Sequence, residues 1–368
     1  MANIWNNPIL AEDMRYLRDR LPEAKRFDGA TILVTGAAGF LGYYISHFLV
    51  YLAEAGIKPK KILLLDKFIL RRPEWIDRLA TAYPNVTVLS FDVATDKLES
   101  VPNASEADYV LHMASIASPV FYRKHPLVTL DANIWGLRHL LDLYRDSKLK
   151  GLLFFSSSEI YGDPAPDAIP TKEDYRGNVS CLGPRACYDE AKRFGETMCW
   201  VFANTFGTQV RIARPFNNYG PGMALADRRA PADFAQCVME NRDIVIHSSG
   251  APTRTFCYIA DAIAGYFKVL LYDKFEAFNI GIEKPEISMR QLAEHFRQSG
   301  EKVAGYKGKV IFQAAEDKEY LTHNPERRCP DISKARTQLN FQPSVLVAEG
   351  VDRFTKFLWH EKQNPASQ

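Results

Sequence analysis

A tyrosine and a lysine stand four residues apart in the segment CYDEAKRFGETM, as Tyr188 and Lys192. In a helix this spacing places both side chains on one face. A phenol with an ordinary pKa of about 10 is a poor base at neutral pH, but a neighbouring ammonium and a cofactor pyridinium favour the phenolate. Such a tyrosine can remove a hydroxyl proton while hydride leaves the same carbon, and Ser157 could hold the reacting oxygen by a hydrogen bond. The alternative is a pair that merely belongs to a solvated helix face.

Three glycines follow the first apolar run, in the segment TILVTGAAGFLG. A glycine-rich turn from a strand into a helix lets backbone N–H groups approach a pyrophosphate at the positive end of the helix. This context favours a dinucleotide site over a simple tight turn. The residues predicted to hold the cofactor here are Gly36, Gly39, Phe40, Leu41 and Gly42.

Asp66 ends the second apolar run, 24 residues after Gly42. A carboxylate at this place can accept hydrogen bonds from the ribose hydroxyls of a dinucleotide. Its charge would repel a 2′-phosphate, so the sequence favours NAD over NADP, although Lys67 beside it weakens this preference. Asp92 and Val93 end the third run and are candidates for the rim of the adenine pocket. The alternative for these two is a strand-end turn residue and a core valine.

Short apolar runs alternate along the chain with longer segments that have helical periodicity. This alternation predicts an α/β fold, a Rossmann-type doubly wound parallel sheet covered on both faces. The predicted strands cover residues 31–34, 61–66, 86–92, 109–114 and 151–157.

The remainder of the chain divides into an arm and a second domain. Residues 9–21 place apolar side chains at helical spacing, so a helical arm is expected ahead of the sheet. After residue 213, turn-rich stretches interrupt the alternation, which predicts a smaller, less regular C-terminal α/β domain for the substrate. The expected boundaries are 1–30 for the arm, 31–212 with 254–280 for the NAD-binding domain, and 213–253 with 281–368 for the substrate domain.

Composition and charge exclude several classes of protein. Of 368 residues, 46% are hydrophobic and 24% charged, which argues against disorder and coiled coil. Lys and Arg number 46 against 44 Asp and Glu, so a nucleic-acid partner is not expected. No signal peptide or membrane span is recognisable, and the six scattered cysteines fit neither a disulfide framework nor a metal site. We therefore expect no metal, no membrane association and a cytoplasmic location.

Several longer motifs together resemble those of the extended short-chain dehydrogenases/reductases that act on nucleotide sugars. The resemblance covers residues 31 to about 358. Within this superfamily the sequence is most similar to the UDP-glucuronate decarboxylases, also called UDP-xylose synthases, whose long central motif is far more specific than the glycine loop. The motifs that carry the resemblance are HMASIASP at 112–119, SSSEIYGDP at 156–164, GPRACYDEAKR at 183–193, RPFNNYGP at 214–221 and RRCPDISKA at 327–335.

The resemblance implies an NAD-dependent decarboxylation without net redox change. Tyr188 would deprotonate the C4 hydroxyl as hydride passes to NAD, giving a 4-keto sugar that loses its C6 carboxylate as carbon dioxide. Ser157 and Tyr188 would stabilise the enolate, and return of the hydride would give the pentose. In the family, Ser158 and Glu159 lie beside C5 and C6, and the glutamate acts in decarboxylation and protonation. The catalytic residues expected on this basis are Ser157, Ser158, Glu159, Tyr188, Lys192 and Arg254.

Arginine and asparagine side chains match the substrate-binding positions of the family. Arg185 and Arg254 could bind the substrate carboxylate bidentately, and Arg254 could equally bind the nucleotide diphosphate. Surface ion pairs are the alternative for both. The expected substrate-binding residues are Arg185, Asn217, Arg229, Arg254 and Arg328.

The chain departs from the family pattern where relatives hold the nucleotide. It has Gly222 in place of the usual arginine, Arg228 within an expected Asp-Gly-Arg segment, and His247 where an aromatic residue usually precedes glycine. The base, uridine or thymidine, and the sugar, glucuronate or an acetamido uronate, therefore stay open. A 4-epimerase is the nearest alternative activity, followed by a 4,6-dehydratase and a non-catalytic NAD-binding scaffold.

Relatives of this type commonly pair two helices per subunit into a four-helix bundle, so a homodimer is expected. The helix after Tyr188 offers Met198, Trp200, Val201 and Phe202 for burial in such an interface. The same side chains could instead serve the core of one subunit.

Overall fold

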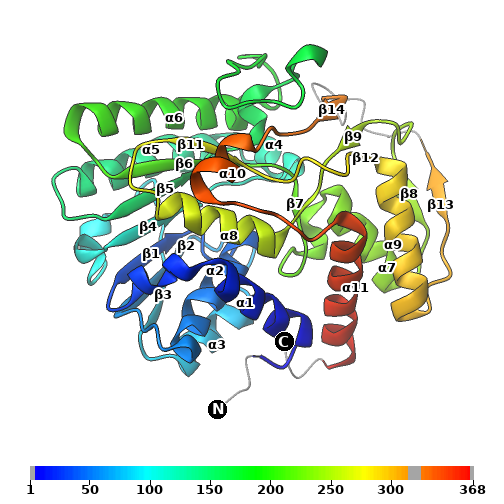
Figure 1. Cartoon of the computed structure of the whole chain (residues 1–368), viewed down its shortest axis with the longest axis horizontal. Coiled ribbons are helices and arrows are strands. Elements are labelled where there is room, and N and C mark those ends of the chain that lie inside the picture. The colour runs from blue at the N-terminus through cyan, green and yellow to red at the C-terminus, as the bar shows by residue number, and fades with distance from the viewer. Residues whose placement is uncertain (1–4, 314–324, 365–368) are drawn as a thin grey trace.

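The structure is a computed structural model that describes residues 5–313 and 325–364. At its centre lies a sheet of seven parallel strands in the order β11-β6-β5-β4-β1-β2-β3 (Figure 1). β1, β4 and β5 are buried along their whole length, as apolar strands covered by helices on both faces must be. The strands are β1 (Thr31–Thr35), β2 (Lys61–Asp66), β3 (Val86–Ser90), β4 (Tyr109–His112), β5 (Gly151–Phe155), β6 (Val210–Pro215) and β11 (Ala277–Ile280).

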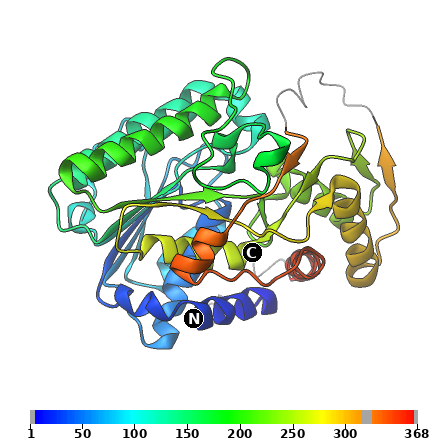
Figure 2. The same cartoon turned by 45° about the horizontal axis from the view of Figure 1, so that its top comes forward.

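Two layers of helices cover the sheet (Figures 1 and 2). α5 (Pro126–Tyr144) and α6 (Ala186–Phe206) lie side by side on one face, whereas α2 (Phe40–Tyr51) and α8 (Ile259–Leu270) lie on the other. The arrangement confirms the predicted Rossmann-type doubly wound α/β fold, and each of the five predicted strands begins at its predicted residue. Two shorter helices, α3 (Glu74–Ala82) and α4 (Pro119–Lys124), complete this part of the chain.

The C-terminal part combines helices with small sheets (Figure 2). β6 still belongs to the central sheet, and the chain returns to this sheet later with α8 and β11. The division into domains stays a prediction. No helix among the described residues is long and apolar enough to cross a membrane. The elements are α7 (Ala230–Glu240), α9 (Met289–Ala304), α10 (Ser333–Leu339) and α11 (Val347–Gln363), with the paired strands β7 (Asn218–Tyr219) and β10 (Cys257–Tyr258), β8 (Ile244–Ile246) and β13 (Val310–Phe312), and the three-stranded group β9 (Thr253–Arg254), β12 (Ile287–Ser288) and β14 (Arg327–Arg328).

The predicted N-terminal helix is confirmed as α1 (Pro8–Arg20), which packs against α8, α11 and α2. Asp13 at its centre is 1% exposed. Its carboxylate accepts hydrogen bonds from the hydroxyls of Tyr44 and Tyr258 and pairs with Arg353, each at 2.6 Å. A buried carboxylate is tolerated only when it is satisfied in this way. Asp13 therefore ties α1 to α2, β10 and α11, and the segment is an integral part of the core.

Candidate active site

A cavity of about 1660 Å³ opens at the carboxyl ends of the central strands. Ligands of open α/β sheets bind at this edge, because the loops that follow parallel strands meet there. The cavity extends to α7, β9 and β14, so the central sheet and the C-terminal part both line it. Every residue predicted from the sequence to bind the cofactor, bind the substrate or act in catalysis lines this one cavity. The individual roles of these residues stay predictions.

The loop that joins β1 to α2 leaves no room for a side chain at two of its glycines. Gly36 has a φ of +71°, and a Cβ there would lie 2.7 Å from the backbone nitrogen of Ala114. A Cβ at Gly42 would lie 2.1 Å from the carbonyl oxygen of Ala37. The N-terminus of α2 therefore presents bare backbone to the cavity, which fits the pyrophosphate of a dinucleotide.

Asp66 stands at the end of β2 with its carboxylate fixed by the backbone. Its oxygens accept hydrogen bonds from Ala38 at 2.9 Å and Phe68 at 2.7 Å, and burial raises the pKa of this carboxyl. The neighbouring Lys67 pairs with Asp92 at 2.5 Å instead. Because Asp92 neutralises this lysine, Lys67 offers little to a 2′-phosphate, and the site fits NAD.

We expect Asp66→Ala to weaken NAD binding by about 1 to 3 kcal/mol, the cost of leaving buried hydroxyl donors without their acceptor. Titration calorimetry with NAD measures this loss. Asp19→Ala is the matched control, because Asp19 pairs with Arg18 at 2.8 Å on the surface of α1 and neither residue lines the cavity. Equal NAD affinity of Asp66→Ala and the wild-type protein would contradict the ribose assignment.

Tyr188 and Lys192 lie on the first turns of α6, 6% and 3% exposed. The hydroxyl of Tyr188 shares a hydrogen bond with the side chain of Ser157. Lys192 donates to the carbonyl oxygen of Phe155 at 2.6 Å, and its Nζ lies 5.7 Å from the centre of the Tyr188 ring. The structure therefore assembles the predicted trio of serine, tyrosine and lysine.

Burial dominates the electrostatics of the trio. It raises the pKa of Tyr188 to about 12, and Ser157 and Arg229 oppose this rise. Burial also lowers the pKa of Lys192 to about 7. At Tyr188 desolvation therefore outweighs the groups that favour the phenolate.

Glu159 is held by two arginines from distant parts of the chain. Arg328 in β14 donates to its two carboxylate oxygens at 2.6 and 2.7 Å, and Arg185 pairs with the same carboxylate. Burial alone would raise the pKa of Glu159, but the charges of Arg328 and Arg185 outweigh burial and lower it to about 2. Glu159 is thus ionised at neutral pH. α6 begins only after Arg185, which is its N-cap residue.

Arg254 and Asn217 make mainly backbone contacts. Arg254 is 7% exposed and donates to the carbonyl oxygens of Thr253, Pro325 and Glu326. Burial, reinforced by the charge of Arg328, lowers the pKa of Arg254 to about 10, so it remains charged at neutral pH. Asn217 adopts a φ of +40° and donates to the carbonyl oxygen of Thr255 at 2.9 Å. Both side chains line the cavity beside Glu159 and its arginines.

The departures from the family motif have a structural reason at one position. A Cβ at Gly222 would lie 2.6 Å from the ring of Tyr43, so this aromatic ring occupies the space beside the glycine. Arg229 pairs with both carboxylate oxygens of Asp227 at 2.5 and 2.8 Å, and its guanidinium lies 5.7 Å from the ring centre of Phe40 in the glycine loop.

Two residues next to the catalytic candidates were not predicted. The ring of Tyr122 is stacked on that of Tyr188 at 5.2 Å, and its buried hydroxyl has no partner among the described residues. Asp189 accepts from Arg185 at 3.4 Å, and burial together with the charge of Glu159 raises its pKa to about 7. Asp189 was visible in the YDEAK motif beside the tyrosine. Tyr122 has no comparable signal, because only tertiary packing brings it to Tyr188.

A glycine loop at a helix N-terminus, an acidic strand end, and a serine, tyrosine and lysine in one cavity define a Rossmann-fold enzyme that uses a dinucleotide. Residues 32–281 match the model of the NAD dependent epimerase/dehydratase family, and the chain belongs to this family. Its cofactor is therefore NAD.

Among curated proteins, UDP-glucuronic acid decarboxylase 1 of Arabidopsis thaliana is 35% identical over 88% of this chain and 68% of its own length. UDP-glucuronic acid decarboxylase 1 of Xenopus tropicalis is 33% identical over 92% of this chain and 75% of its own. A solved structure of UDP-glucuronic acid 4-epimerase from Bacillus cereus, with UDP-glucuronic acid and NAD, is 25% identical with a TM-score of 0.71 and covers 90% of this chain and 99% of that one.

Proposed function

We propose that the protein is an NAD-dependent decarboxylase of a nucleotide-linked uronic acid, converting UDP-glucuronate to UDP-xylose. The observation that carries this proposal is the group of buried arginines around Glu159, which follows Ser157 by two residues and whose charge acts on Tyr188. Arg185, Arg254 and Arg328 together carry more positive charge than Glu159 neutralises, so this part of the cavity suits an acidic sugar better than a neutral one. The curated relatives described above act on the same kind of substrate by their names.

Tyr188 and Ser157 would carry out the oxidation at C4. Bound NAD would accept the hydride and return it, and its positive charge would lower the pKa of Tyr188. Ser157 holds the reacting oxygen while Tyr188 takes its proton, and both then donate hydrogen bonds to the enolate oxygen. The C6 carboxylate is β to the new ketone, so carbon dioxide leaves as the electrons pass to that oxygen. Protonation at C5 and reduction at C4 complete the pentose.

The arginines give Glu159 a defined role. With Arg185 and Arg328 on its carboxylate, Glu159 is an anion at neutral pH and orients the two guanidinium groups toward the sugar. Because Arg328 gives both of its Nη groups to Glu159, a uronate carboxylate would be held by the excess positive charge of these fixed arginines. Such preorganisation is how buried charges contribute to catalysis.

A 4-epimerase of the same nucleotide sugar is the second candidate, favoured by the shared fold and 25% identity with the UDP-glucuronic acid 4-epimerase structure. Product mass separates the two activities. Purified protein with NAD should convert UDP-glucuronate to a pentose nucleotide lighter by one carbon dioxide. A product of unchanged mass would favour the epimerase.

The proposal also concerns which base the substrate carries and which substituent stands at C2 of its sugar. The cavity continues to His247, Phe234 and Met289, which lie at its α7 end. Uridine is the default base, and comparing UDP-glucuronate, its thymidine analogue and the 2-acetamido uronate by kcat/KM ranks the three directly.

A homodimer formed through α5 and α6 is also part of the proposal. These helices expose Trp135, Phe194, Trp200 and Val201, with Trp135 and Trp200 each 56% exposed. Phe202, which the sequence also offered to the interface, is 4% exposed and belongs to the core of the subunit. Large apolar side chains gathered on one pair of helices are typical of an interaction surface, because monomers rarely expose large contiguous apolar patches.

We expect the wild-type protein to sediment as a dimer at micromolar concentration, and Trp200→Glu to shift it toward the monomer, since a buried charge would oppose association. Leu346→Glu is the matched control, because Leu346 is 52% exposed just before α11, away from this face. A monomeric mass for the wild-type protein in sedimentation equilibrium would contradict the homodimer.

A cytoplasmic location completes the proposal. All six cysteines are free thiols, and four of them are buried. Free thiols are typical of proteins from reducing compartments.

A further inference from the structure

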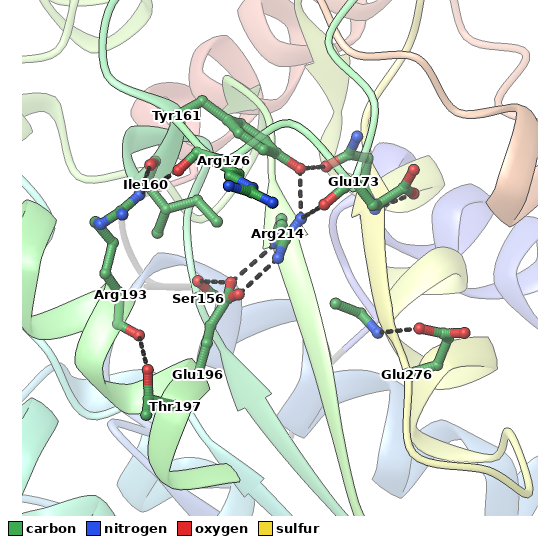
Figure 3. A network of polar contacts seen from close by, with 12 residues as sticks. Ser156, Ile160, Tyr161, Glu173, Arg176, Arg193, Glu196, Thr197, Arg214 and Glu276 are labelled. Atoms are coloured by element: carbon green, nitrogen blue, oxygen red, sulfur yellow. Dashed lines mark hydrogen bonds and ion pairs between the residues drawn. The ribbon is translucent and has the colours of Figure 1, made fainter. Parts of the chain in front are cut away.

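Behind the catalytic residues lies a buried polar network centred on Arg214, at the end of β6 (Figure 3). Its Nε and Nη2 donate to the two carboxylate oxygens of Glu196 in α6, at 2.9 and 2.6 Å. Its Nη1 donates to the hydroxyl of Tyr161 at 2.7 Å and to the carbonyl oxygen of Glu173 at 2.8 Å. Arg214 and Glu196 are shielded from solvent, with side chains 11% and 14% exposed. Neither residue lines the cavity.

The network forms hydrogen bonds with both ends of the segment 156–161, which carries Ser157, Ser158 and Glu159. At the start of this segment, the hydroxyl of Ser156 donates to Glu196 at 2.5 Å. At its end, Tyr161 accepts from Arg214 and donates to Asn279 in β11 at 2.7 Å. One guanidinium is thus linked, directly or through its carboxylate partner, to the residues that flank the catalytic turn (Figure 3).

The same network is anchored in the helix that carries the catalytic tyrosine. Glu196 follows Lys192 by four residues, so the two side chains project from the same face of α6. Lys192 binds the carbonyl oxygen of Phe155, and Glu196 binds the hydroxyl of Ser156, the next residue along the chain. Two successive turns of α6 therefore hold two successive residues at the end of β5.

We propose that Arg214 and Glu196 are positioning residues, which hold the segment 156–161 against α6 so that Ser157 and Glu159 face Tyr188. A buried ion pair adds little net stability, because desolvation offsets its attraction, but its bidentate geometry fixes the groups that it joins. A displacement of about 1 Å at reacting groups can cost on the order of 10²-fold in rate. The proposal rests on the proposed function, because its test measures that reaction. The contacts of Arg214 and Glu196 do not depend on which sugar nucleotide is bound.

Ser156→Ala and Tyr161→Phe test the proposal without leaving a buried charge unpaired, since each removes one hydroxyl and keeps the ion pair. We expect each variant to lower kcat for carbon dioxide release by about 3- to 10-fold, and the double variant by about 30-fold or more, within the range that misplacement produces. KM for UDP-glucuronate and the affinity for NAD should change by less than about twofold, because the side chains predicted to bind the substrate and the cofactor all remain. Glu276→Gln is the control: it loses an ion pair with Lys334 in the same region at 2.7 Å, without contact to the segment, and should retain the wild-type kcat (Figure 3).

Hydrogen exchange supplies a readout that needs no activity. Backbone amides of residues 157–162 should exchange faster in the double variant, while those of β1 and α8 keep their protection. A wild-type kcat in the double variant, or a kcat loss accompanied by loss of NAD affinity and of protection throughout the chain, would overturn the proposal. If the wild-type protein releases no carbon dioxide from any uronate, the proposed function fails instead, and the rate of NADH formation with the accepted sugar nucleotide then decides the positioning role.

Discussion

Tyr188→Phe should abolish the first oxidation of the sugar, lowering the rate of NADH formation by about 10² to 10⁴, as is typical for loss of a positioned general base. The ring and its stacking on Tyr122 remain in this variant, so only the hydroxyl that shares a hydrogen bond with Ser157 is lost. No carbon dioxide should appear, because decarboxylation requires the ketone at C4. Rapid mixing with UDP-glucuronate and absorbance of NADH measure the effect.

Tyr144→Phe is the matched control for this loss. Tyr144 is a buried tyrosine whose hydroxyl donates to the carbonyl oxygen of Ala104 at 2.6 Å, and neither residue lines the cavity. It should lose stability of about 1 kcal/mol and keep its activity. Oxidation by Tyr188→Phe at more than a tenth of the wild-type rate would mean that another group takes the proton.

Glu159→Gln should separate oxidation from decarboxylation. Tyr188, Ser157 and the NAD site remain intact, so NADH should still form, but Arg185 and Arg328 lose the anion that orients them. We expect carbon dioxide release to fall by about 10²-fold or more, on the scale of a lost catalytic group. NADH absorbance should therefore rise and persist, where the wild-type protein shows at most a transient.

Glu286→Gln controls for the loss of a bidentate arginine partner. Glu286 binds Arg327, the neighbour of Arg328 in β14, at 2.8 and 3.0 Å, but does not line the cavity. Its substitution should leave both steps within about twofold of wild type, as surface ion pairs contribute little. If Glu159→Gln blocks NADH formation as well, Glu159 acts before decarboxylation and the assigned order of roles is wrong.

Much of the fold and the cofactor site could be predicted because their signals are local. The glycine loop needs bare backbone at Gly36 and Gly42, and both the spacing and the flanking apolar runs are readable along the chain. The position of Asp66 beside the glycine loop is also predictable, since the end of the second strand lies next to the end of the first in a parallel sheet. The tyrosine and lysine share one helix, so their spacing alone brings them together.

The partners of these residues could not be predicted, because they depend on tertiary contacts. Glu159 meets Arg328 across a sequence separation of 169 residues, and no spacing rule relates the two. The pKa of Tyr188 follows from how completely the fold buries it, which no pattern along the chain indicates. The place of Phe202 could not be predicted either, since only the folded structure shows that this side chain is buried in the core of the subunit.

Decarboxylation is tested most directly with UDP-glucuronate that carries carbon-13 in its C6 carboxylate. Purified protein with NAD should release labelled carbon dioxide in proportion to the pentose nucleotide formed, with no net NADH at the end of the reaction. Product that keeps the label, or no conversion of this substrate, its thymidine analogue or the acetamido uronate, would contradict the decarboxylase assignment.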